Sequence, residues 1–253
     1  MPASDSPEYL ARKAFFEKVL TIYGRNAVME ALNDESLTIH RLHLSRSNQA
    51  SSQLKKMQAI AAKRNIEIVH HDKNALSHIS KNARQDQGVA LDLIWEQQLS
   101  AENFAGRHDA YRLIALDGIH NPQNLGMIIR SCAAGKIDGI ILSTKKSAKI
   151  SPLVIKASAG TLFRIPIVKS DDLVETLAYF KSREAALYTL SSHAEMSYRE
   201  EQYTSKTIFV LGNESEGVSR EIESLCDRAI AIPMERSVES LNVAVTAALL
   251  AFM

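Results

Sequence analysis

Apolar residues recur along the chain with two alternating periods, about every second residue and about every third or fourth, which predicts strands and helices in turn. We expect a short leading helix over residues 7–20. The rest of the first half alternates between helices, expected over 25–32, 51–63 and 73–79, and strands, expected over 39–44, 66–70 and 88–94. This alternation predicts a compact α/β unit.

The second half of the chain keeps alternating. Strands are expected over 111–116, 139–142, 165–168, 185–190, 207–211 and 229–232. Helices are expected over 125–134, between the strand at 165–168 and residue 180, and over 243–252. Strands that alternate with helices favour a largely parallel sheet with helices on both faces. The predicted fold class is therefore α/β in both halves.

A polar stretch from Glu96 to Asp109, which includes Gly106, interrupts the pattern and predicts a linker. With 253 residues and 45% hydrophobic content, the chain is long enough for two packed cores. The predicted division is a helical extension over 1–20, a first domain over 21–96, the linker over 97–110 and a second domain over 111–253.

Two further features bear on the protein's surroundings. No apolar run reaches the roughly 18 residues that cross a bilayer, and residues 1–9 lack the order of a signal peptide. We therefore expect a soluble, cytoplasmic protein with no membrane partner. Cys132 and Cys226 match no metal-ligand spacing, so we expect small core residues and no metal site.

The formal net charge of +1 hides two basic stretches. Residues 41–84 contain nine Lys or Arg against two acids, and residues 143–169 contain six Lys or Arg with no acid. Such stretches could follow a phosphate backbone, although Lys-rich helix surfaces are also ordinary. Nucleic acid is thus one partner that the charge pattern allows.

Three segments with unusual residues follow predicted strands, at the strand ends where parallel sheets commonly bind ligands. The first contains Asn124-x-Gly-x-x-x-Arg130, and the second is a loop over 210–218 with glycines at 212 and 217. The third joins Ile232-Pro233-Met234 to Ser240-Leu241-Asn242. Each has a plainer interpretation: Asn124 and Ser240 as helix N-caps, Arg130 as a solvated residue, and the glycine loop as an ordinary turn.

Together, in this order and spacing, the three segments resemble the signature motifs of the SpoU (TrmH) family of the SPOUT superfamily, a likeness that extends over 111–253. Lys156-Ala157-Ser158-Ala159-Gly160 resembles the family's stretch between its first two motifs. Residues 22–28 and 86–90 resemble the ribosomal-protein-like RNA-binding domain that precedes the catalytic domain in many members.

The resemblance implies a SPOUT catalytic domain with a parallel sheet and a C-terminal trefoil knot, and a homodimer formed through that domain. It implies S-adenosylmethionine as the cofactor, S-adenosylhomocysteine as the product and no metal. The cofactor-binding roles carry over to Leu211, Gly212, Gly217, Ile232, Met234, Leu241 and Ala244. The catalytic roles carry over to Asn124, Arg130, Glu214, Ser240 and Asn242.

The implied activity is transfer of a methyl group to a ribose 2′-hydroxyl in structured RNA. Ribosomal RNA is the first choice of substrate, tRNA is the alternative, and a non-catalytic RNA-binding protein of the same fold is the rival from another class. The residues expected to contact RNA are Arg25, Arg41, Lys55, Lys145, Lys146 and Lys156.

Arg130 has two possible roles, a general base or a cation that holds the phosphate and the attacking oxygen. A guanidinium has no acceptor and resists deprotonation, which favours the cation. Lys136, Ser215 and Arg236 stand where the family usually has glycine, and the sequence leaves open whether they impair cofactor binding.

Overall fold

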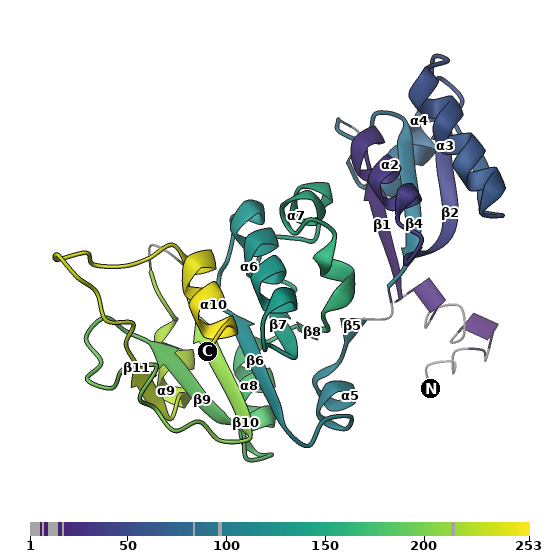
Figure 1. The fold of residues 1–253 in the computed structure, drawn as a ribbon. Helices are drawn as coiled ribbons and strands as arrows, with labels where there is room; N and C mark the ends of the chain where they lie inside the picture. The colour runs from purple at the N-terminus through teal and green to yellow at the C-terminus, as the bar shows by residue number, and fades with distance from the viewer. Residues whose placement is uncertain are drawn as a thin grey trace. The chain divides into compact units, whose positions relative to one another are not determined.

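The chain folds into two compact units, Met1–Glu96 and Gln97–Met253, which we describe one at a time (Figure 1). The computed structural model describes residues 6, 8–9, 15–16, 18–82, 84–95, 98–213 and 216–253. Half of the helix expected over 7–20 lies outside these residues, as do Glu214 and Ser215.

From residue 18 to 95, the described part of the N-terminal unit forms a four-stranded mixed sheet with three helices. Its elements are β1 (Val19–Tyr23), α2 (Arg25–Asn33), β2 (Thr38–Ser45), α3 (Ser52–Lys63), β3 (Glu67–His71), α4 (Lys73–Ser80) and β4 (Val89–Ile94). The strand order is β1-β4-β2-β3, in which β4 is antiparallel to both neighbours and β3 is parallel to β2. All predicted elements over 25–94 are present.

Strand β1 corrects one prediction, because residues 19 and 20 were expected to end a helix. They extend along β4 instead, with Val19 opposite Ile94 and Leu20 opposite Leu93. Pairing with the central strand outweighs the weak helical periodicity of this segment.

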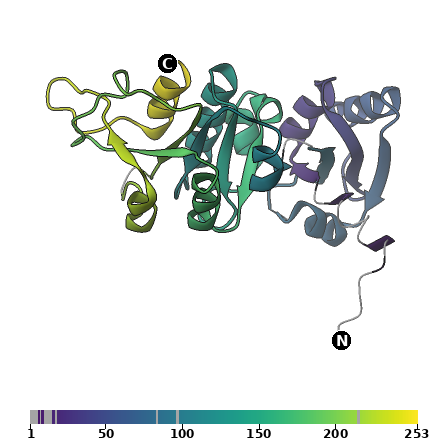
Figure 2. The same cartoon turned by 90° about the horizontal axis from the view of Figure 1, so that it is seen from below.

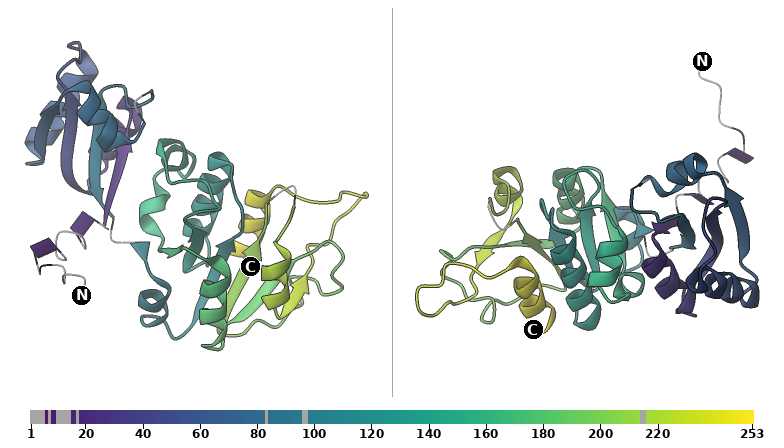
Figure 3. Two further views of the ribbon diagram at one scale, coloured as in Figure 1. Left: turned by 180° about the vertical axis from the view of Figure 1, so that it is seen from behind. Right: turned by 90° about the horizontal axis from the view of Figure 1, so that it is seen from above.

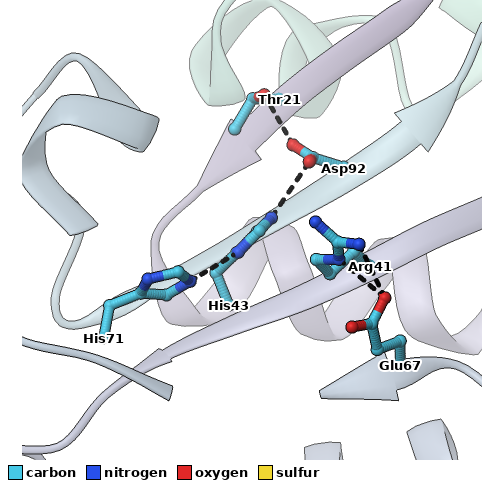
Figure 4. Close-up of polar contacts among 6 residues, drawn as sticks. All are labelled: Thr21, Arg41, His43, Glu67, His71 and Asp92. Atoms are coloured by element: carbon cyan, nitrogen blue, oxygen red, sulfur yellow. Dashed lines mark hydrogen bonds and ion pairs between the residues drawn. The ribbon is translucent and has the colours of Figure 1, made fainter. Parts of the chain in front are cut away.

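A chain of hydrogen-bonded side chains crosses one face of this sheet (Figure 4). The Thr21 hydroxyl donates to Asp92 Oδ1 at 2.6 Å, and His43 Nε2 lies 2.9 Å from Asp92 Oδ2. On its other side, His43 Nδ1 lies 2.9 Å from His71 Nε2. His43 and Asp92 are buried, so their partners supply the hydrogen bonds that water gives to exposed groups. We call these four residues the histidine chain.

The C-terminal unit is a seven-stranded sheet in which every pairing is parallel, with the order β11-β9-β10-β6-β7-β8-β5. Its strands are β5 (Gln98–Leu99), β6 (Tyr111–Leu116), β7 (Gly139–Ser143), β8 (Ile167–Ser170), β9 (Ala186–Leu190), β10 (Lys206–Leu211) and β11 (Arg228–Ile230). Its helices are α5 (Ala101–Ala105), α6 (Pro122–Ala134), α7 (Pro152–Ala157), the short 3-10 helix η1 (Thr161–Arg164), α8 (Leu173–Lys181), α9 (Arg220–Leu225) and α10 (Val243–Ala251).

Helices cover both faces of this sheet, as predicted. Helices α5, α8 and α9 enclose one apolar core, which includes Phe104, Leu177 and Ile222. Helices α6, α7 and α10 pack together on the opposite face, as Figures 2 and 3 show. The parallel sheet is thus buried on both sides, and ligands have access at its edges and ends.

The segment expected as a linker, 97–110, differs from the prediction. It contains the edge strand β5, which pairs with β8, and the one-and-a-half-turn helix α5. Phe104 is fully buried against Tyr111 and Phe180 and fixes α5 to the core. A single aromatic residue in a polar stretch gives little periodicity, although its burial holds the segment in place.

Helix α6 packs at backbone distance against two neighbours. A Cβ on Gly126 would overlap the Ala157 side chain of α7, and a Cβ on Gly135 would overlap the carbonyl of Ala251 in α10. The backbone N–H of Lys136 also donates to Ala251 O at 2.7 Å. The C-terminal helix is therefore held at the end of α6, while the trefoil knot stays a prediction.

None of the helices formed by the described residues has both the length and the apolar character needed to cross a lipid bilayer.

Candidate functional site

The first and second motif segments leave the sheet side by side. Strands β6 and β10 are adjacent and parallel, with Leu116 opposite Leu211, so the loops that follow them lie side by side at the carboxyl ends of the strands. Asp117 joins these loops: its N–H donates to Leu211 O at 2.9 Å, and its buried carboxylate accepts from Ser219 N at 2.8 Å. A charge-assisted hydrogen bond of this kind holds two backbone turns together.

The loop after β10 folds tightly around its glycines. Gly212 has no room for a side chain, because a Cβ there would overlap the backbone of Gly217. Asn213 closes the turn by accepting from Glu216 N at 2.8 Å through its side chain and from Gly217 N at 3.0 Å through its carbonyl. The predicted backbone-lined loop is therefore present, while the predicted roles of Glu214 and the departure at Ser215 fall outside the described residues.

The third motif segment meets the first at the start of α6. Asn242 caps α10 by accepting from Ala244 N at 2.9 Å, and its Nδ2 donates to Asn124 Oδ1 at 3.3 Å. Asn124 is buried in the first turn of α6, behind the cap formed by Asn121. Two predicted catalytic residues, 118 positions apart, are thus hydrogen-bonded to each other.

Arg130 lies on a different face of α6 from Asn124. It is exposed, as is Met127 three residues before it, whereas Ile128 and Ile129 are buried against the sheet. Among the residues that the structure describes, the guanidinium has no hydrogen-bond or ion-pair partner. It is consequently available to an external anion.

A cavity of about 690 Å³ lies beyond β11, and two of the predicted cofactor residues, Ile232 and Met234, line it. Its other wall comes from residues 192–197, which the sequence analysis did not select. Leu211, Gly212, Gly217, Leu241 and Ala244 do not line this cavity. The three motif segments thus meet beyond the carboxyl ends of the strands. The seven predicted cofactor residues, however, do not all line one cavity among the described residues.

The turn between Met234 and Ser240 has an unusual backbone. Arg236 and Ser237 both have positive φ, 58° and 59°, and Val238 N donates to Glu235 O at 3.2 Å. Glycine adopts this conformation more readily than arginine, so Arg236 carries a conformational cost at a position where glycine is usual in the family. Ser240, at the far side of the turn, is exposed.

Lys136 is accommodated without such a cost. Its side-chain Nζ donates to Met253 O at 3.0 Å, in addition to the backbone bond to Ala251. The lysine therefore links the end of α6 to the last residue of the chain.

The basic residues predicted to contact RNA differ in availability. Lys145 and Lys146 are exposed in the loop after β7, which is tied to the first motif by a hydrogen bond from Ala148 N to Ile119 O, and Lys156 is exposed on α7. In the N-terminal unit, Arg41 pairs with Glu67 at 2.7 Å, Arg25 Nε donates to Gln87 O at 3.3 Å, and Lys55 is exposed.

Both cysteines are held in the thiol form. Burial raises the pKa of the Cys226 thiol to about 11 and raises that of fully buried Cys132 as well, which keeps both thiols protonated near neutral pH. No metal-binding group of His, Cys, Asp or Glu occurs within the described residues.

Sequence reasoning missed Asp117, which joins the two loops. The available signal was an acidic residue placed directly after a buried strand and directly before Gly118, whose φ of +73° allows the turn. The wall over 192–197 gave no such signal, because its Ser, His and Ala residues are typical of any loop.

Comparisons with known proteins match both halves of the chain. Residues 111–252 match the SpoU rRNA Methylase family, and residues 21–94 match the family described as RNA 2′-O ribose methyltransferase substrate binding. An uncharacterized tRNA/rRNA methyltransferase of Mycolicibacterium gilvum is 30% identical over 236 residues, which cover 89% of this chain and 73% of that protein.

Solved structures share the fold. The SpoU methyltransferase AviRb from Streptomyces viridochromogenes, solved with AdoMet, has a TM-score of 0.67 at 20% identity over 98% of this chain and 91% of that one. An AdoMet-bound rRNA methyltransferase from Sinorhizobium meliloti has a TM-score of 0.63 at 20% identity, over 95% and 88%. With the family match over more than half of its length, this chain belongs to the SpoU family of RNA methyltransferases.

Proposed function

We propose that this protein transfers a methyl group from S-adenosylmethionine to a ribose 2′-hydroxyl of structured RNA, with ribosomal RNA as the first choice. One observation carries the proposal: motif segments far apart in sequence meet beyond the carboxyl ends of the central strands, through the Asp117–Ser219 and Asn124–Asn242 hydrogen bonds. The ribose 2′-oxygen is the acceptor named for the family that residues 21–94 match.

The residues at this end of the sheet fit the cofactor. The cavity beside Ile232 and Met234, about 690 Å³, has the size of small-molecule sites, and the loop at Gly212 exposes backbone without side chains. Both AviRb and the S. meliloti enzyme were solved with AdoMet. When bound, S-adenosylmethionine supplies an electrophilic methyl group. The residues proposed to hold it are Leu211, Gly212, Gly217, Ile232, Met234, Leu241 and Ala244.

Within the site, Arg130 acts as a cation that binds the target phosphate and the attacking ribose oxygen. Its exposure and its lack of partners among the described residues suit a group that binds substrate. Asn124, Ser240 and Asn242 orient the ribose and the cofactor, and Glu214 is assigned to the same task. Correct positioning can contribute about 7–11 kcal/mol to such a reaction in favourable cases.

A second copy of the chain is the proposed partner of the C-terminal unit. Met127 on α6 and Val245 and Phe252 in and after α10 are 42, 47 and 63% exposed, and these two helices pack against each other. Large exposed apolar side chains on adjoining helices are typical of protein interfaces. Arg130 shares the exposed face with Met127, so in such a dimer it would lie close to the partner and serve the partner's site.

The test of this mechanism is Arg130→Ala. We expect transfer of labelled methyl groups to RNA to fall about 100- to 1,000-fold, the range associated with losing a key charge-stabilising group, with nearly unchanged calorimetric affinity for S-adenosylmethionine. Arg183→Ala removes an exposed arginine just before β9, at the amino ends of the parallel strands, whereas the motif loops follow their carboxyl ends, and should keep full activity. Equal activity of Arg130→Ala and the wild type would remove Arg130 from the mechanism.

Three measurements separate the alternatives. Absence of S-adenosylmethionine binding at millimolar concentration would favour the non-catalytic RNA-binding protein of the same fold. If labelled methyl is transferred, resistance of the modified linkage to alkaline hydrolysis identifies the 2′-oxygen. Comparing ribose methylation of rRNA and tRNA with and without the gene then identifies the substrate.

A further inference from the structure

A cavity of about 280 Å³ lies within the N-terminal unit, separate from the site beyond the carboxyl ends of the parallel strands. It is formed by the ends of β2 and β3, the connection after β2 and the first two turns of α3. Leu44 and Leu54, both buried, supply apolar surface inside it, and Gln58 supplies an amide. The cavity therefore combines an apolar interior with a group able to donate and accept hydrogen bonds.

Two cationic side chains and one imidazole line this cavity. Arg46, Lys55 and His70 line it, all three are exposed, and its lining includes no Asp or Glu. Within the described part of the chain, these three side chains have no hydrogen-bond or ion-pair partner. Two other arginines of the unit are occupied: Arg41 pairs with Glu67, and Arg64 donates to the carbonyls of Leu32, Asp34 and Leu37 at 2.6–3.0 Å.

Hydrogen bonds within the protein fix the walls of the cavity. Asn48 Nδ2 donates to Gly88 O at 2.8 Å, and Asn48 N donates to Ser45 O at 3.2 Å. The amide of Asn48 lies so close to Gly88 that no Cβ would fit there. Ser51 caps α3 by accepting from Leu54 N at 3.2 Å. A preformed hollow loses little entropy when a ligand enters it.

We propose that this cavity seats one unpaired RNA nucleotide, with its phosphate against Arg46 and Lys55 and its base between Leu44 and Leu54 beside Gln58. The inference rests on the proposed function, in which RNA is the substrate. A hollow this small holds a single nucleotide and excludes a duplex, and proteins recognise RNA sequence mainly at unpaired, extruded bases. Cations bind the phosphate, and the apolar floor covers the face of the base.

The first experiment uses two neighbouring lysines of α3. Lys55 lines the cavity, whereas Lys56 is exposed outside it. Fluorescence anisotropy with a labelled single strand of about 12 nucleotides is expected to show about tenfold weaker binding for Lys55→Ala, equivalent to about 1.4 kcal/mol, and less than about twofold for Lys56→Ala. Equal effects of the two substitutions would mean diffuse electrostatic attraction and would overturn the proposal.

The second experiment fills the cavity without changing charge. Ala50→Phe places a ring at the lining, in the connection just before α3, and Ala59→Phe places the same ring on an exposed position of α3 outside the cavity. Only Ala50→Phe should weaken single-strand binding, by about tenfold. Unaltered fluorescence of Trp95, the one tryptophan of the chain, reports that the unit remains folded. Unimpaired binding by a folded Ala50→Phe variant would disprove the cavity site.

Binding measurements with other nucleic acids and with a free nucleotide identify the ligand. A duplex of the same length should bind more weakly than the single strand, and equal binding would contradict the proposal. Adenosine monophosphate that binds more tightly than the oligonucleotide would identify a free nucleotide as the ligand and would also overturn it. If the single strand binds through Lys55 but no methyl is transferred, the proposed function fails while this inference stands.

Discussion

In the N-terminal unit, side-chain hydrogen bonds run across the sheet itself, through the four members of the histidine chain on four adjacent strands. In the C-terminal unit, the central strands carry buried apolar residues on both faces, and polar contacts gather in the loops beyond their ends. Changes of charge or protonation should therefore act mainly on the first unit. Substitutions that add a side chain where backbones touch should destabilise mainly the second unit.

The largest expected effect comes from Gly212→Ala. Because the new Cβ would overlap the backbone of Gly217, the loop must move, and we expect the C-terminal unit to lose about 3 kcal/mol of stability together with S-adenosylmethionine binding. Thermal unfolding followed by circular dichroism, with calorimetry for the cofactor, measures both. Gly160→Ala meets no atom within 4 Å, so only its left-handed backbone costs energy, about 1 kcal/mol. Equal losses in the two variants would contradict the steric argument.

An intermediate effect is expected from Asp92→Ala, which tests the opposite side of the comparison. The substitution leaves the His43 ring and the Thr21 hydroxyl without their acceptor, which should cost the N-terminal unit about 2–3 kcal/mol. Denaturant titration followed by Trp95 fluorescence measures this loss, and cofactor binding by the C-terminal unit should not change. Thr21→Val removes one hydrogen bond only and should cost about 1 kcal/mol. An equally large loss from Thr21→Val would show that His43 contributes little.

The smallest effect is a loss of stability of the N-terminal unit in acid. Desolvation, followed by the charge of His43, lowers the pKa of His71 below 6.5. Desolvation acts upward on Asp92, but hydrogen bonds from His43 and Thr21 leave its pKa below 3.8. Both groups bind protons more readily in the unfolded chain, so stability is full above 6.5, falls below that value as His71 titrates, and falls further near 3.8.

Trp95 fluorescence at several pH values checks this prediction. His71→Gln should flatten the dependence just below pH 6.5. A wild-type stability that is level between pH 7 and the range near 4 would refute the argument.

The sequence predicted most of the elements, because alternating apolar residues determine which face of a strand or helix is buried. It failed where tertiary contacts decide the structure. Val19 and Leu20 pair with β4, and Phe104 anchors α5 in a segment that is otherwise polar. At the site, the motif positions indicated that Asn124 and Asn242 act together. Periodicity could not reveal that Asp117 joins two loops, because that role depends on the neighbouring strand.

The two glycine contacts of α6 also bear on how the molecule can move. At Gly126 and Gly135 the helix meets α7 and α10 with no intervening side chain that could change rotamer and absorb a displacement. Close-packed contacts of this kind transmit strain without slack. A shift of α10 on ligand entry would therefore carry α6 and α7 with it as one rigid block, and Lys156 would move in step with Asn242.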